Sequence, residues 1–195
     1  ERLYANGSFQ GAHDLYEKVD RKPLPKEAVR WIEFRIADTD WRSQAASKTG
    51  DPSRYETSRQ KLEELVRDAA RVEDRDRVWA EVQESLGDFW WTRRDQRNWW
   101  QGWQHYQLAL DWWGGAADVE LARKKYLGMV WRAVRPADVE DWYYYGYYGN
   151  WIPVPVLENV LQIAQSKEDL SHAHFLMAVG LKHQGEWESQ ARIPE

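Results

Sequence analysis

The chain contains no cysteine among its 195 residues. This absence excludes disulfides, thiolate metal sites and cysteine nucleophiles from the segment. It says little about the compartment, because both reducing and oxidising environments tolerate a protein without cysteine.

An excess of positive charge and a long apolar run are also missing. The formal net charge is -5 and the isoelectric point is about 5.6, so no basic field is available to neutralise phosphates, and nucleic acid is not an expected partner. Purely apolar stretches are as short as WIPVPVL, Trp151 to Leu157, whereas a membrane-spanning helix needs roughly 20 apolar residues. We therefore expect no membrane insertion by this segment.

The third missing pattern is the alternation of apolar and polar residues that marks a half-buried strand. Apolar residues instead recur at helical spacing, and glycine and proline interrupt the pattern as turn residues do. The sequence therefore predicts an all-α protein. Predicted helices cover about 9–19, 26–41, 52–66, 76–93, 99–113, 118–130, 155–164 and 166–181, with Asp51, Asp118 and a Ser166–Asp169 capping box as start signals.

Aromatic residues are abundant, with 14 Trp, 10 Tyr and 4 Phe. Each such side chain buries on the order of 150 to 250 Å², so most of them are expected in the core. The pairs Trp90–Trp91, Trp99–Trp100 and Trp112–Trp113 place adjacent rings about 100° apart on a helix, which suits a helix sandwiched between two layers. Predicted buried faces include Ala12, Leu15, Tyr16 and Val19, then Trp99, Trp103, Tyr106, Leu110 and Trp113, and then Val119, Ala122, Tyr126, Met129 and Val130.

One pattern repeats along these helices: an apolar residue, a small residue three later, Tyr four later and another apolar residue three later. It occurs as Phe9, Ala12, Tyr16, Val19, as Trp99, Gly102, Tyr106, Ala109, and as Val119, Ala122, Tyr126, Met129. The pattern resembles the second helix of a tetratricopeptide repeat, and Leu86, Gly87 and Trp90 resemble the Leu-Gly element of its first helix. The resemblance implies an array of antiparallel helix hairpins in a right-handed superhelix. The three small residues are 90 and 20 residues apart, and neither spacing is a multiple of the family's repeat of about 34 residues.

A second resemblance rests on RWIEFRIADTDWR (30–42), VWAEVQESLGDFWW (78–91) and LARKKYLGMVWRA (121–133). These strings resemble the helical-repeat region that precedes the macroglobulin domains in some large bacterial alpha-2-macroglobulin-like proteins. Such proteins are extracytoplasmic protease traps whose thioester requires a cysteine, so the resemblance implies an accessory domain and an extracytoplasmic location. We expect residues 1–195 to form one helical-repeat domain of a longer chain, cut within a repeat at both ends.

Two groups of residues are candidate partner-binding sites. The aromatic segment contains Trp142, Tyr143, Tyr144, Tyr145, Tyr147, Tyr148 and Trp151, and its rings form either a stacking surface for a sugar or peptide or a buried plug between helix pairs. Arg35 and Arg42 share a helix face with Asp38, as a carboxylate clamp, a partly buried ion network or a solvated salt bridge.

No other group has the spacing that chemistry requires. His172 and His174 are two residues apart and point to different sides of a helix, whereas metal sites on helices use spacings of three or four. We therefore expect no catalytic residue, metal or cofactor. The sequence favours a scaffold that binds another protein or other domains of its parent chain. The alternative is a carbohydrate-binding or cell-wall-processing helical domain that uses the aromatic segment 142–151.

Overall fold

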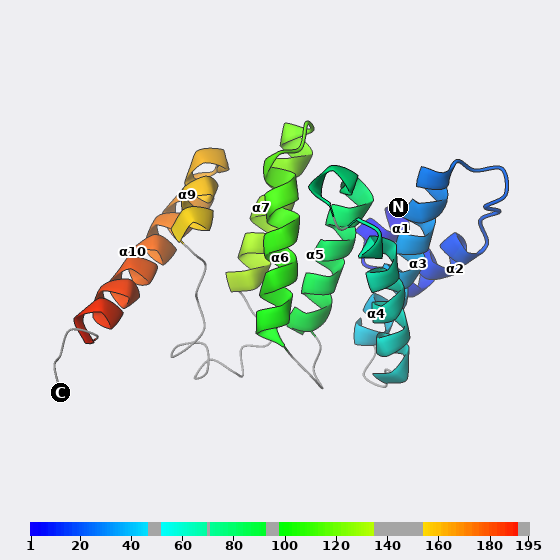
Figure 1. The fold of residues 1–195 in the computed structure, drawn as a ribbon, viewed down its shortest axis with the longest axis horizontal. Coiled ribbons are helices and arrows are strands. Elements are labelled where there is room, and N and C mark those ends of the chain that lie inside the picture. The colour runs from blue at the N-terminus through cyan, green and yellow to red at the C-terminus, as the bar shows by residue number, and fades with distance from the viewer. Residues whose placement is uncertain (47–51, 70, 93–97, 135–153, 191–195) are drawn as a thin grey trace. The chain divides into compact units, whose positions relative to one another are not determined.

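The computed structural model describes residues 1–46, 52–69, 71–92, 98–134 and 154–190. Every regular element in these ranges is helical (Figure 1), which confirms the predicted all-α class. Contacts between Cα atoms group the chain into two compact units, Glu1–Trp112 and Trp113–Glu195. The bounds of the helices are α1 Arg2–Ala5, α2 Phe9–Glu17, α3 Lys26–Ala46, α4 Pro52–Arg67, η1 Val72–Asp74, α5 Arg77–Thr92, α6 Trp99–Gly114, α7 Val119–Val134, α9 Val154–Ile163 and α10 Lys167–Gln190.

The eight predicted helices are all present, and α1 and η1 are two short helices that the sequence pattern did not indicate. Several helices start where polar side chains can accept a hydrogen bond from the first turn. The backbone N–H of Leu121 donates to Asp118 over 3.0 Å, as predicted. Ser166 accepts from the N–H of Asp169 over 3.0 Å, and its hydroxyl donates to the Asp169 carboxylate over 2.6 Å, so Ser166 caps the helix as predicted. Helix α4 begins at Pro52, while Asp51 lies outside the described residues.

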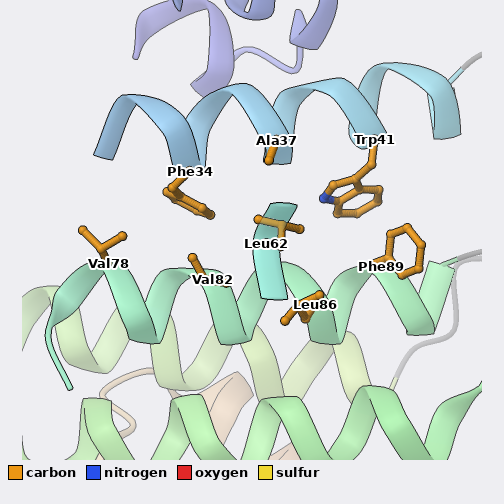
Figure 2. Packing of buried hydrophobic residues seen from close by; sticks show 8 residues of the cluster. All are labelled: Phe34, Ala37, Trp41, Leu62, Val78, Val82, Leu86 and Phe89. Atoms are coloured by element: carbon orange, nitrogen blue, oxygen red, sulfur yellow. The ribbon is translucent and has the colours of Figure 1, made fainter. Parts of the chain in front are cut away.

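The core of the first unit lies where α3, α4 and α5 meet (Figure 2). One face of α3 presents Phe34, Ala37 and Trp41 to α5, as residues three and four apart on a helix must. Helix α5 contributes Val78, Val82, Leu86 and Phe89 to the same core. Leu62 of α4 lies between α3 and α5. The Trp41 and Phe89 rings meet edge to face, with centroids 5.7 Å apart. Helix α5 therefore packs against both helices of the α3–α4 hairpin.

Glycine brings α5 and α6 close together. A Cβ atom placed on Gly87 would lie 2.4 Å from the Tyr106 ring, and one placed on Gly102 would lie 3.1 Å from the Trp91 ring and 3.2 Å from the Gly87 carbonyl oxygen. Tyr106 is fully buried against this contact. The small residue Gly102 and the Tyr106 ring one turn later thus form the close contact of α6 with α5.

The predicted face of α2 is only partly buried. Ala12 is buried and Tyr16 is half-buried, but the Leu15 side chain is 56% exposed. The prediction for Leu15 is wrong because α2 packs mainly on α3 and the short α1, so only a narrow stripe is covered. Val119 is also exposed, not buried as predicted, because it stands at the first residue of α7.

In the second unit, α7 packs against α9, and α9 packs against α10. Its buried side chains include Tyr126, Met129, Val130, Leu157, Val160, Ala173 and Leu176. The Tyr126 hydroxyl accepts a hydrogen bond from Asn159 over 3.2 Å. Trp131 donates to Asp169 over 2.7 Å and stacks on the His172 ring, with centroids 4.6 Å apart. These contacts join α7 to both helices of the α9–α10 pair.

Candidate functional site

A stripe of charged side chains runs along α3 beside its apolar face. Arg35, Asp38 and Arg42 each follow a core residue by one position, so they lie about 100° around the helix from the apolar stripe. Asp38 is fully buried, and Arg35 is 6% exposed. The sequence placed these three residues on one face correctly. It left open how deeply they are buried.

Helix α5 carries the matching polar stripe. Asp38 Oδ1 accepts hydrogen bonds from Ser85 Oγ over 2.5 Å and from Arg42 Nε over 2.8 Å. Arg42 Nη2 then donates to Asp88 Oδ2 over 2.7 Å, and the Trp41 indole N–H donates to Ser85 over 3.0 Å. We call these linked residues the polar seam. Arg42 pairs with Asp38 on its own helix and with Asp88 on α5, and both carboxylates are buried, so the seam is a buried ion network and not a solvated salt bridge.

Helix α6 closes one end of the seam. The Tyr106 hydroxyl donates to Asp88 Oδ1. Nearby, Nδ1 of His105 lies 2.7 Å from the Gln83 side-chain oxygen. Burial lowers the pKa of His105 to about 4, because a partly buried imidazole loses part of the hydration that stabilises its charged form. His105 is therefore neutral at pH 7.

The buried Arg35 pairs with the exposed Glu1 at the other end. Its Nη2 lies 3.1 Å from a carboxylate oxygen of Glu1, and the Trp31 indole and the Tyr16 hydroxyl donate to the other oxygen over 3.0 and 2.9 Å. Burial opposes ionisation of Glu1, but the charge of Arg35 and these hydrogen bonds lower its pKa overall. The Arg35 guanidinium also lies 4.0 Å from the centroid of the Tyr4 ring.

The seam explains why Arg35 and Arg42 carry charge inside the protein. Arg42 lies 17% exposed, between Asp38 and Asp88, so its guanidinium is held inside the unit. Arg35 is bound to Glu1. Removing a buried carboxylate beside Arg42 would leave its buried charge less compensated, which is strongly destabilising. The seam thus fixes how α3, α5 and α6 pack.

A more accessible feature is a groove along the α3–α4 hairpin. It consists of two open cavities with volumes of about 340 and 450 Å³. Glu33, Glu64 and Leu65 line both cavities, so the two adjoin. We call them together the α3–α4 groove. The first cavity is also lined by Leu24, Lys26, Val29, Arg30 and Asp68, and the second by Glu17, Arg21, Ile36 and Lys61.

The groove is lined by both apolar and charged side chains. Leu24, Val29, Ile36 and Leu65 supply the apolar surface, and the remaining side chains that line it are charged. Arg30 is fixed in the wall, since it pairs with Asp76 and donates to the Leu65 carbonyl oxygen over 3.0 Å. The volumes of the two cavities lie within the range of ligand-binding cavities, but their lining is richer in charge than that of a typical small-molecule site. Sequence reasoning missed this groove, because its residues are scattered over α2, α3, α4 and the turn between α2 and α3.

The structure does not describe the aromatic segment that is a candidate site in the sequence. Trp142, Tyr143, Tyr144, Tyr145, Tyr147, Tyr148 and Trp151 all lie outside the described residues. Within the described ranges, no group of His, Asp or Glu side chains could hold a metal ion, and His172 stacks on Trp131. Across the same residues, no helix is long and apolar enough to span a bilayer.

Comparison with known proteins finds no match to this chain among protein-family models, curated proteins or solved structures. The resemblances to tetratricopeptide repeats and to alpha-2-macroglobulin-like proteins therefore stay predictions.

Proposed function

We propose that this chain is a non-catalytic, tetratricopeptide-like scaffold that binds a peptide segment of another protein, or of its own parent chain, in the α3–α4 groove. The observation that carries the proposal is the groove itself, which is open and lined by apolar side chains together with charges of both signs. Apolar surface supplies binding energy in such sites, and charged groups select the partner and its orientation.

The packing of the first unit supports a repeat-like construction. Helices α3 and α4 form a hairpin, and α5 packs against both members of it. Gly87 and Tyr106 then provide the close α5–α6 contact that the Leu-Gly and small-residue patterns imply. Repeat arrays of this kind stack hairpins so that each contacts its neighbours, and they present extended binding surfaces.

The polar seam supports a scaffold over an enzyme. Asp38 and Asp88 are held by hydrogen bonds from Ser85, Arg42 and Tyr106. Such hydrogen bonds between helices favour a role of these carboxylates in packing. The carbohydrate-binding alternative depends on the segment 142–151, for which the described residues offer no observation.

The absence of cysteine provides a direct test. Glu64 and Arg67 are both exposed on α4, but only Glu64 lines the groove. A single Glu64→Cys variant labelled with a bulky maleimide blocks the groove, and a labelled Arg67→Cys variant is the matched control. Peptides selected from a randomised displayed library on the unlabelled chain are expected to bind the control unchanged and the blocked variant at least about tenfold more weakly.

Far-ultraviolet circular dichroism should show the same thermal midpoint for both labelled variants, since both positions are exposed. The proposal fails if the library yields no enriched peptide. It also fails if the enriched peptides bind both labelled variants equally well.

A further inference from the structure

We infer that the α3–α4 groove selects a partner segment in which a single arginine stands between two apolar residues. The inference rests on the proposed function and specifies its ligand. It is argued from the order of charged and apolar side chains along the groove.

The middle of the groove is acidic. Glu33 on α3 and Glu64 on α4 are both exposed, and each lines both cavities. Among the residues that the structure describes, Glu33 forms no ion pair, and Glu64 has only Arg67, at 3.6 Å and with both side chains largely exposed. Two carboxylates on neighbouring helices of one hairpin thus flank the place where the cavities adjoin.

Apolar surface lies on each side of these carboxylates. Leu65 lines both cavities. Leu24 and Val29 line only the first, and Ile36 lines only the second. A segment lying along the groove would therefore place an apolar side chain in each cavity and a cation between them. The stem of a long basic side chain can also cover Leu65, since such stems pack on apolar surface while the charge stays in water.

Arginine suits the centre better than lysine. A guanidinium has five donors in a planar fork and can bind two carboxylates at once, whereas an ammonium is a compact point charge. The basic groups of the groove do not fill this role themselves. Arg30 is engaged by Asp76 and the Leu65 carbonyl, and Arg21 lies 4.0 Å from Glu17.

The ends of the groove argue against a strongly basic partner. Lys26 lines only the first cavity and Lys61 only the second. Each would repel a further positive charge placed beside the central arginine. Asp68 in the first cavity and Glu17 in the second offset one of these charges each, but the residues that line only one cavity still carry more positive than negative charge. The pattern therefore fits one basic residue in an apolar context better than a run of them.

The test uses peptides enriched from the randomised library on the unmodified chain. The expected consensus has one arginine flanked by apolar residues. Replacing that arginine by citrulline, which keeps the shape and removes the charge, should weaken binding about tenfold or more, the size expected for a charge-assisted hydrogen-bonded pair. The same replacement should change binding less than about twofold on the double variant Glu33→Gln, Glu64→Gln, because the carboxylates that recognise the charge are gone.

A matched control is Glu27→Gln, since Glu27 is exposed on α3 and does not line the groove. On this variant the citrulline penalty should equal that on the unmodified chain. An equal penalty on the double variant would place the arginine elsewhere and overturn the inference. Groove-binding peptides without arginine, or polybasic ones, would overturn it too while leaving the proposed function intact. A library that yields no groove-binding peptide would overturn both this inference and the proposed function.

Discussion

Replacing Gly87 by Ala tests the close packing of α5 and α6. The new methyl carbon would lie 2.4 and 2.5 Å from two carbons of the Tyr106 ring, far inside van der Waals contact. Tyr106 is fully buried, so the ring cannot swing into solvent. Overpacking of this kind costs about 1 to 3 kcal/mol. A ring shift that breaks the hydrogen bond from Tyr106 to Asp88 adds about 1.5 to 3 kcal/mol, because the acceptor is charged.

One effect opposes this loss. Alanine is favoured over glycine inside a helix by about 1 kcal/mol. The net expectation for Gly87→Ala is therefore a loss of about 1.5 to 5 kcal/mol in the free energy of unfolding. Urea denaturation followed by far-ultraviolet circular dichroism measures it.

The decisive comparison repeats the substitution in a Tyr106→Ala background. There the ring is absent, so Gly87→Ala should stabilise the chain by about 1 kcal/mol, its helix propensity alone. The sign of the effect thus reverses between the two backgrounds. A loss of the same size in both backgrounds would refute the claim that α5 and α6 meet through this glycine and this ring.

Three further predictions concern single side chains. Asp88→Ala should cost about 3 to 5 kcal/mol, since it removes one of the two carboxylates that hold the Arg42 guanidinium and the acceptor of the buried Tyr106 hydroxyl. The exposed Asp111→Ala should change the unfolding free energy by less than about 0.5 kcal/mol, and equal effects in urea denaturation would contradict a buried network. The folded chain should lose stability as the pH falls from 6.5 towards about 4, because His105 has a pKa of about 4 when folded and binds its proton more readily when unfolded. The loss of stability from protonating His105 amounts to about 3 kcal/mol at most. Urea denaturation at a series of pH values measures it, and the loss should be absent in His105→Gln. Ser166→Ala should cost about 1 kcal/mol through loss of the helix cap, while Ser171→Ala, exposed within the same helix, should cost nothing measurable; a similar loss for both would argue against the capping box.

The helices of this chain could be predicted from its sequence because their signals are local. The apolar spacing of Val78, Val82, Leu86 and Phe89 is typical of a helix. Ser166 and Asp118 mark helix starts through hydrogen bonds that span three residues. Such contacts depend on neighbours in sequence alone, so they can be read without knowing the fold.

The candidate sites could not be predicted in the same way. The link from Arg42 to Asp88 spans 46 residues, and nothing in either helix alone says that the other will face it. The α3–α4 groove depends likewise on how the turn after α2 lies beside two helices. One signal was available: Glu81, Ser85 and Asp88 share a helix face directly beside the apolar stripe of α5, which indicates a second, polar contact surface.

The pairing of an apolar stripe with a parallel polar one has a consequence for variation among homologues. A purely apolar contact lets one helix slide or roll on another at little cost in free energy, and its residues can be exchanged one at a time. In this chain, rolling α5 on α3 would bring carboxylates onto Phe34 and Trp41, so Asp38 with Ser85 and Arg42 with Asp88 are expected to change together or not at all. Their joint substitution would preserve the alignment of the two helices even where every other contact has drifted.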